Sequence, residues 1–427
     1  MNPVGTAASD AASEISHDQV PADPPAAGGE TGTNETGMDA AAFAALLGEI
    51  AEFRDTIVAP GVARWEDDKR MAPEALRAAS TLGLLSLEVP AELGGLALTF
   101  AQKCRVVEVL SAVSMPFAFS LVNTANIAAR VARLGTAAHR ERYLSDLMAG
   151  RRFGSTALTE PGAGSDFANI ATTATRVDGG WRLDGAKAWI TNAALSDIVI
   201  CYAQTEPDAR SRGIAAFLVD GTRPGFERLA PYALAGGHLI GTGGFRLDGY
   251  VAEHDDLIGA PGDAFVAAMS SVNGARTYVA AMCCAMTQAT LAGAVRYGTV
   301  RKAFGAPLIG HQGLAWKLAG VQNRLEAARL LTDRAIEAVS ESLRAGDASG
   351  AILPAAHAKK FAAETAEADI AACIQAMGAE GLRSSYPWGH HLVAARIANY
   401  VDGSSEIQTD RIARSLRELY AGGSHSS

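Results

Sequence analysis

The spacing of apolar positions changes twice along the chain and divides it into three parts. From 38 to about 150, apolar residues recur at helical spacing, as in Phe43, Leu46, Leu47, Ile50 and Phe53. From 151 to about 261, short β-rich runs alternate with turn clusters, as in WRLDGAKAWIT, IVICYAQ and GIAAFLVD. From 262 to 421 the pattern returns to alanine-rich helices, which we expect over Ala275–Tyr297, Ala315–Ala345 and Leu353–Met377. The predicted fold class is mostly α with a central β domain.

The two ends of the chain carry too few large apolar side chains to form a core. Residues 1–37 are rich in Ala, Pro, Gly, Ser, Asp and Glu, so burial cannot offset the entropy of ordering them. We expect a disordered tail there and a frayed end over 422–427.

Length and charge restrict the class of protein. A chain of 427 residues is long enough for several packed layers, and long alanine-rich helices commonly pack against copies of themselves, so we expect a homo-oligomer. The net charge of −9 lacks the basic surface that nucleic-acid binding needs. The apolar run from Tyr278 to Tyr297 contains Thr287, Gln288 and Thr290, which favours a buried helix over insertion into a membrane.

Five cysteines are widely spread, without metal-ligand spacing and odd in number. They predict free thiols, a cytoplasmic location and no metal site. The N-terminus shows no secretory signal pattern.

Two glycine-containing stretches in the strand region are candidates for ligand binding. In ALTEPGAGSD (157–166) small residues would let a ligand approach the backbone closely, although the stretch lacks the third glycine of a dinucleotide fingerprint. In GAKAWITN (185–192), strand alternation would place Trp189 and Thr191 on one face, where a flat cofactor could lie. Each stretch alone is also compatible with an ordinary turn or strand.

Taken together, these two stretches resemble the flavin-binding core of the acyl-CoA dehydrogenase family. Three further stretches agree: RKAFG (301–305) with His311 and Gln312 resembles RxxFG and HQ, QAMGA (375–379) resembles the QxxGGxG loop, and YVDGSSEIQ (400–408) resembles YEGTSQIQ. The similarity spans about Met38 to Leu419.

The resemblance implies a helical N-terminal domain (38–150), a β-barrel-like middle domain (151–261) and a C-terminal four-helix bundle (262–421), assembled around FAD as a homotetramer or dimer. It implies α,β-dehydrogenation of an acyl thioester, carried by coenzyme A or an acyl carrier protein, with electrons passed to an acceptor such as an electron-transfer flavoprotein. Asp402 stands at the position of the base that removes the α-proton, and its backbone N–H would bind the thioester carbonyl. The implied substrate contacts are Ser165, Asn273, Arg276, Asp402 and Gly403. The implied cofactor contacts are Leu158, Thr159, Gly164, Ser165, Trp189, Thr191, Arg301, Phe304, His311, Gln312, Gln375, Gly378, Ser404 and Glu406.

The chain departs from the family pattern around the base. Asp402 replaces the usual Glu and is one methylene shorter, Glu406 replaces Gln, and Asn273 replaces an acid in the stretch that contacts the acyl carrier. Two alternatives follow. One is an oxidase that resembles nitroalkane oxidases, which use Asp as base, and the other is a flavin-binding homologue without catalysis.

Three other polar features are expected to be structural. Glu160 lies in a turn, and His390 and His391 have no further ligand cluster. Lys359 and Lys360 are expected on a solvated helix face.

Overall fold

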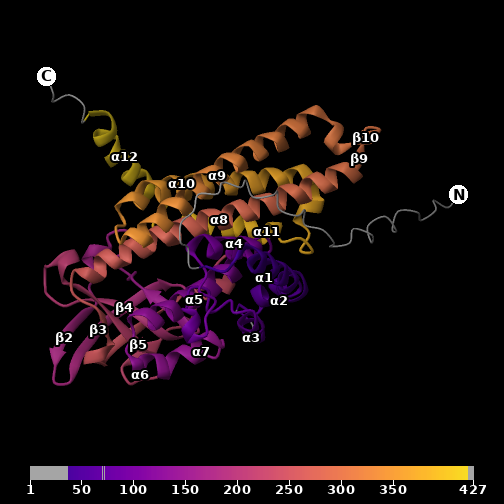
Figure 1. Cartoon of the computed structure of the whole chain (residues 1–427). Helices are drawn as coiled ribbons and strands as arrows, with labels where there is room; N and C mark the ends of the chain where they lie inside the picture. Colours follow the sequence, from indigo (N-terminus) through magenta and orange to yellow (C-terminus); the bar gives the residue numbers. More distant parts are fainter. Residues whose placement is uncertain (1–36, 70, 72, 422–427) are drawn as a thin grey trace. The chain divides into compact units, whose positions relative to one another are not determined.

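The computed structural model describes residues 37–69, 71 and 73–421. The predicted disordered tail, except Gly37, and the predicted frayed end therefore lie outside the described residues. Within them, helices are followed by strands and then by helices (Figure 1), as the predicted fold class requires.

The first part is helical, and α5 is its central element. Apolar residues cover almost every side of α5, so it packs against both α4 and the first strand. At the second contact Gly154 lies so close to Ile127 that an added Cβ would be 2.5 Å from the isoleucine Cβ. The helices are α1 (Ala40–Phe53), α2 (Ala59–Asp67), α3 (Pro73–Thr81), α4 (Phe100–Ser111), α5 (Met115–Leu134), α6 (Ala137–His139) and α7 (Ser145–Met148).

The middle part is one sheet of mixed direction. Its strand order is β6-β7-β3-β2-β4-β5-β8, and β1 pairs in parallel with β4. All seven residues of β5 are buried, because one face of this strand meets the rest of the sheet and the other meets helices. The strands are β1 (Phe153–Ala157), β2 (Thr173–Val177), β3 (Gly180–Ile190), β4 (Ser196–Gln204), β5 (Ile214–Asp220), β6 (Phe226–Arg228), β7 (Gly243–Glu253) and β8 (Leu257–Gly259).

The last part is a helical bundle built around α8. It consists of α8 (Asp263–Val300), a short hairpin of β9 (Lys302–Ala303) and β10 (Ala306–Pro307), α9 (Gln312–Ala345), α10 (Ile352–Met377), α11 (Trp388–Ala398) and α12 (Ser405–Ala421). The three long helices include the predicted ranges, and α8 begins twelve residues earlier than expected, because nothing between Asp263 and Ala275 breaks a helix. Among the described residues, α8 alone is long and apolar enough to cross a membrane, but 83% of its apolar window is buried in the bundle.

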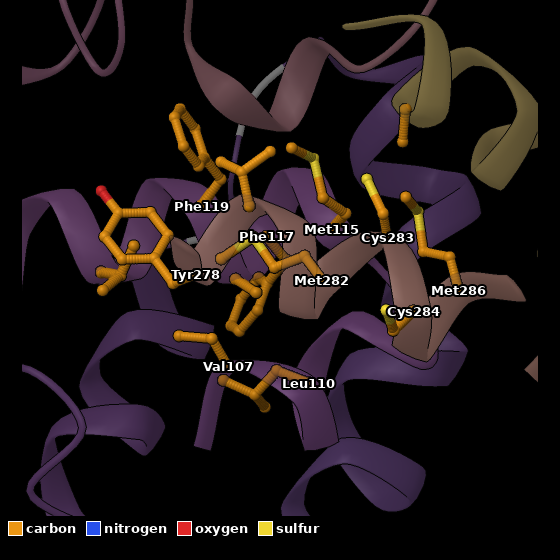
Figure 2. Close-up of a cluster of buried hydrophobic side chains, with 14 of the residues drawn as sticks. Val107, Leu110, Met115, Phe117, Phe119, Tyr278, Met282, Cys283, Cys284 and Met286 are labelled. Carbon is orange, nitrogen blue, oxygen red and sulfur yellow. The ribbon is translucent and has the colours of Figure 1, made fainter. Parts of the chain in front are cut away.

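The bundle and the N-terminal helices share one core. Figure 2 shows Val107 and Leu110 of α4 and Phe117 of α5 lying against Met282 of α8. Close packing also demands a small residue on α8, because a Cβ on Gly293 would be 2.4 Å from the Trp388 ring. All five cysteines are buried and free, as expected.

Candidate active site

A cavity of about 880 Å³ lies where the three parts of the chain meet. Its wall is formed by α4 and α5, by loops of the sheet, by the first turns of α8, and by the segment that joins α11 to α12. This volume lies within the range of pockets that bind small molecules and cofactors. The residues predicted for the site that line it are Leu158, Thr159, Gly164, Ser165, Trp189, Thr191, Asn273, Arg276, Asp402, Gly403 and Ser404.

Asp402 lies in the tight turn between α11 and α12. The backbone there is left-handed, with φ 53° at Asp402 and 90° at Gly403, which is a costly conformation for an aspartate. Three side chains hold the turn: Arg276 Nε donates to the Asp402 carbonyl (3.0 Å), and the Gly403 carbonyl accepts from Lys359 Nζ (2.7 Å) and Gln408 Nε2 (3.0 Å). These contacts determine the direction in which the carboxylate points.

The Asp402 carboxylate is poorly solvated. Its Oδ2 is buried and accepts no hydrogen bond from any described residue, although the side chain lines the cavity. Burial raises the pKa of Asp402 to about 6, and the charges of Lys359 and Arg276 oppose that rise. Burial likewise lowers the pKa of Lys359 to about 8. A carboxylate with a free oxygen and a pKa near neutrality is suited to accept a proton from a bound ligand.

On the sheet side of the cavity, Trp189 exposes a flat aromatic surface. The residue is 61% exposed, and its ring lies 4.7 Å from that of Tyr232. The predicted alternation is wrong at this point, because β3 ends at Ile190 with an irregular register, Trp189 has φ 59° and Thr191 follows the strand. Both residues nevertheless line the same cavity, since the bulge turns the indole toward it.

Asn192 anchors the turn that carries Thr191. It is 1% exposed with φ 64°, and its Nδ2 donates to the carbonyls of Ser120 (2.9 Å) and Gly154 (3.1 Å). The turn is thereby attached to both α5 and β1, which gives Thr191 a defined position. The amide of Asn192 tolerates the left-handed backbone that most residues avoid.

A buried ion pair supports the backbone beneath Leu158 and Thr159. Lys187 Nζ lies 2.7 Å from Glu160 Oε1 and 3.3 Å from the Leu158 carbonyl, and Glu160 also accepts from the backbone N–H groups of Ala171 and Thr172. The structural role predicted for Glu160 fits these contacts.

A second group of the predicted cofactor residues lies far from this cavity. Arg301 follows Arg276 by 25 helical positions, which corresponds to about 37 Å along α8 at 1.5 Å per residue. Gln375 and Gly378 lie at the end of α10 that is remote from Lys359. This remote group consists of Arg301, Phe304, His311, Gln312, Gln375 and Gly378. Glu406 also lies outside the cavity wall, but it follows Ser404 by only two positions.

Comparison with known proteins assigns the family. Family models match over the N-terminal (42–151), middle (155–249) and C-terminal (262–417) domains of acyl-CoA dehydrogenases. The chain is 32% identical to the mitochondrial short-chain specific acyl-CoA dehydrogenase of Bos taurus over 371 residues, which covers 86% of this chain and 88% of that protein. It is 30% identical to an acyl-CoA dehydrogenase of Bacillus subtilis, with coverage of 86% and 96%. The chain belongs to the acyl-CoA dehydrogenase family.

A solved structure agrees with this assignment. Butyryl-CoA dehydrogenase from Megasphaera elsdenii superposes with a TM-score of 0.80 at 28% identity, covering 88% of this chain and 97% of that chain. Members of the acyl-CoA dehydrogenase family bind FAD and act as oxidoreductases on CH–CH bonds.

The sheet side of the cavity fits the FAD of acyl-CoA dehydrogenases. The backbone of the 157–166 stretch is open, since a Cβ on Gly162 would meet nothing and one on Gly164 only the Thr159 methyl at 3.8 Å. An exposed indole and the Thr191 hydroxyl beside open backbone suit a flat ring with polar edges. The residues that would hold this ring are Leu158, Thr159, Trp189 and Thr191.

In an acyl-CoA dehydrogenase that uses this site, activity should depend on pH through Asp402. Because only the carboxylate accepts a proton and its pKa is about 6, kcat/KM should rise about tenfold per pH unit below 6 and level off above it. Rates of flavin reduction measured between pH 4.5 and 8 test this expectation. A flat profile across pH 5 to 7 would show that Asp402 is not the base.

Lys359 is the functional neighbour that the sequence prediction placed wrongly. It is fully buried and donates to the carbonyls of Gly403 and Asn399, whereas Lys360 lies near the surface and pairs with Glu364. The sequence did carry a signal, because Lys359 shares a helix face with apolar residues. Ala355, four positions before it, and Ala362, three positions after it, are both buried. A lysine on such a face must find partners inside the protein.

Among the described residues, no group of three or more His, Cys, Asp or Glu side chains could hold a metal ion. His391 is buried, and its ring nitrogens lie 3.2 Å from Thr290 Oγ1 and from the Val113 carbonyl, as a structural histidine would be.

Proposed function

We propose that this acyl-CoA dehydrogenase removes the α-proton of an acyl thioester with Asp402 and thereby forms the α,β-unsaturated thioester. The observation that carries the proposal is the unpartnered Asp402 carboxylate in the wall of a cavity whose other side presents Trp189 and Thr191. FAD, when bound, supplies the acceptor for the hydride that leaves the β-carbon.

The chain's own groups divide the remaining work. Asp402 accepts the proton, and Arg276, Lys359 and Gln408 keep its turn in place, because each donates to a backbone carbonyl of that turn. A base held in this way loses little conformational entropy when the substrate binds. Such pre-organisation of the reacting groups accounts for a large part of the rate acceleration by enzymes. The short aspartate side chain makes this placement more demanding than for a glutamate.

The cavity is also suited to an anionic acyl carrier. Five arginines line it against two acids, Glu88 and Asp402, and Arg411 Nε is buried without a partner among the described residues. A phosphate-bearing carrier would complement this charge. Both coenzyme A and the phosphopantetheine arm of an acyl carrier protein meet that requirement. The arginines are Arg130, Arg133, Arg276, Arg396 and Arg411.

The resemblance implies that Asn273 contacts the acyl carrier, and Asn273 lines the cavity. Its side-chain oxygen accepts from Arg276 Nη1 at 2.7 Å, and the residue is 3% exposed. We propose that Asn273 orients Arg276, and through it the base turn.

The decisive experiment incubates the purified protein with saturated acyl thioesters on coenzyme A and on an acyl carrier protein, with an artificial electron acceptor. Conversion to a thioester lighter by two hydrogens supports the proposal, and the preferred carrier follows from the ratio of kcat/KM values. If no thioester loses hydrogen on either carrier with the flavin bound, the proposal is wrong.

A second candidate is an oxidase acting on another acidic carbon, as in nitroalkane oxidation, because Asp402 stands where Glu is usual in the family. Turnover of nitroalkanes with release of hydrogen peroxide, in place of electron transfer to a dye or an electron-transfer flavoprotein, would favour it. A homologue without catalysis is the third possibility, and it predicts no turnover with either class.

We further propose a homo-oligomer in which the remote group serves the cavity of a second copy. Phe304 is 99% exposed with φ 52°, and Arg301, Gln312, Gln375 and Gly378 are exposed at the same end of the bundle. An exposed aromatic residue beside polar groups is typical of an interface. The exposed Trp316 of α9 extends the apolar area.

Replacing Phe304 by Ser should therefore weaken flavin binding without touching the chain's own cavity. The expected effect is a rise of about tenfold or more in the flavin dissociation constant, in the range of an interface aromatic residue. Flavin content per chain and sedimentation velocity measure it. Val266→Ser, at a residue 65% exposed near the start of α8, is the matched control. Unchanged flavin content and assembly in Phe304→Ser would contradict the oligomer proposal.

A further inference from the structure

A charged pair, Glu88 and Lys103, lies in the wall of the cavity. Lys103 Nζ lies 2.5 Å from Glu88 Oε2, and both residues line the cavity. Their side chains are only 6% and 14% exposed. Lys103 belongs to α4 and Glu88 to the segment before it, fifteen positions earlier.

Further polar and aromatic groups surround the lysine. Its Nζ is 3.4 Å from Asn126 Oδ1 and lies over the rings of Phe100 and Tyr278, at 5.0 and 5.7 Å from their centres. Asn126 Nδ2 in turn donates to Tyr278 Oη at 3.5 Å. The ammonium group is therefore largely occupied by the protein.

The carboxylate of Glu88, by contrast, has an oxygen to spare. Its Oε2 faces Lys103, while Oε1 accepts no hydrogen bond from any described residue. The side chain of Glu88 is slightly exposed, and it lines the cavity. The wall thus presents a hydrogen-bond acceptor to whatever enters the cavity.

An ion pair is an unusual feature in the wall of a pocket that binds an unsubstituted alkyl chain. Burying two charges costs several kcal/mol per ion, and apolar replacements of similar volume are often neutral or stabilising, so the pair contributes little to folding. An alkyl group placed against Glu88 would also remove water from the free oxygen. The oxygen would then lose its hydrogen bonds to water and gain none in return, which is unfavourable. A ligand with a donor at this point removes that penalty.

The polar wall and the base line the same cavity. Tyr278 lines the same cavity and is two positions from Arg276, which holds the Asp402 turn. Both Asp402 and Glu88 contribute to the raised pKa of Tyr278, after the larger effect of burial, so this ring lies within electrostatic reach of both carboxylates.

We propose that the natural substrate is an acyl thioester with a hydrogen-bond donor, a hydroxyl or an amine, on its acyl group, and that Glu88 accepts from this donor while Lys103 holds Glu88. This inference rests on the proposed function and specifies its substrate class. A terminal carboxylate is excluded by the same geometry, because it would face the Glu88 oxygen.

The test compares four coenzyme A thioesters of equal chain length: pentanoyl, 5-hydroxypentanoyl, 5-aminopentanoyl and glutaryl. If only an acyl carrier protein supports turnover, the same four acyl groups are loaded on it. A hydrogen bond to a charged group corresponds to a gain of about ten- to hundredfold, so one donor-bearing thioester should exceed pentanoyl by that factor in kcat/KM, mainly through KM. The hydroxyl and amine arms show which donor is used, and glutaryl should be the poorest.

The paired variant Glu88→Leu with Lys103→Met tests the wall itself. Making both positions apolar should cancel the preference, so that the ratio of kcat/KM for the donor-bearing thioester to kcat/KM for pentanoyl falls to about one, while thermal unfolding and flavin content stay close to wild type. The inference is overturned if wild type prefers pentanoyl, or if the paired variant keeps the preference for the donor. The inference is also overturned if none of the four acyl groups is oxidised while another acyl thioester is, whereas the proposed function itself fails only if no acyl thioester is oxidised on either carrier.

Discussion

Asp402→Asn should reduce the rate of flavin reduction by a thioester by about 10²- to 10⁴-fold, the range expected for loss of a positioned general base. The amide has the same shape but accepts no proton, while Arg276, Lys359 and Gln408 contact only backbone carbonyls of the turn and can keep it in place. Stopped-flow measurement under anaerobic conditions gives the rate. A variant that keeps more than a tenth of the wild-type rate would exclude Asp402 as the base.

Stability provides the control, since it should change in the opposite direction. The folded pKa of Asp402 is about 6, above its ordinary 3.8, so the folded state binds the proton more tightly than the unfolded state. The free energy of unfolding is therefore not reduced by this group below pH 3.8, and it decreases as the pH rises from 3.8 to 6. The decrease is at most about 3 kcal/mol, at 1.36 kcal/mol per pKa unit. The neutral amide avoids this loss, so Asp402→Asn should unfold at a higher temperature than wild type at pH 8. An inactive variant that is less stable would indicate structural damage.

Lys187→Met should destabilise the protein by about 3–5 kcal/mol, because it leaves Glu160 charged and buried without its cation. The two residues are 1% and 5% exposed and 2.7 Å apart. Burial alone would raise the pKa of Glu160, but Lys187 and the N–H groups of Thr172 and Ala171 hold it below its ordinary value. The stability from Glu160 is thus present above its ordinary pKa and is lost as pH falls. Urea unfolding at pH 7 measures the change.

Flavin content should fall with stability in Lys187→Met, since Leu158 and Thr159 directly precede Glu160. The matched control is the double variant Glu160→Gln with Lys187→Met, which removes both charges and should recover most of the lost stability. If the single variant unfolds as wild type does, the pair does not support this loop.

The sequence was sufficient for the order of elements and for one half of the candidate site. Helical and strand periodicity marked α8, α9, α10 and the strands β3 to β5, because each buries a face or its whole surface against its neighbours. The motif residues from Leu158 to Thr191 share one cavity with Asn273, Arg276 and the 402–404 turn.

What the sequence missed depends on contacts between distant segments. The bulge at Trp189 is set by pairing with β7, and the burial of Lys359 depends on the turn at 399–403, forty positions away. The ion pair of Glu88 and Lys103 was not predicted either, although Phe100, Val106 and Val107 place Lys103 on the apolar face of α4. A charge on a buried helix face was the signal in both lysine cases.

Asp402 is proposed to take a proton from an acyl thioester beside a bound flavin. The most direct measurement records the visible spectrum of the purified protein and adds the acyl thioesters without oxygen, for wild type and for Asp402→Asn. A thioester should bleach the flavin of wild type, whereas the variant should keep both its flavin and its colour. A protein that binds no flavin after reconstitution, or a variant that is bleached as fast as wild type, would contradict this proposal.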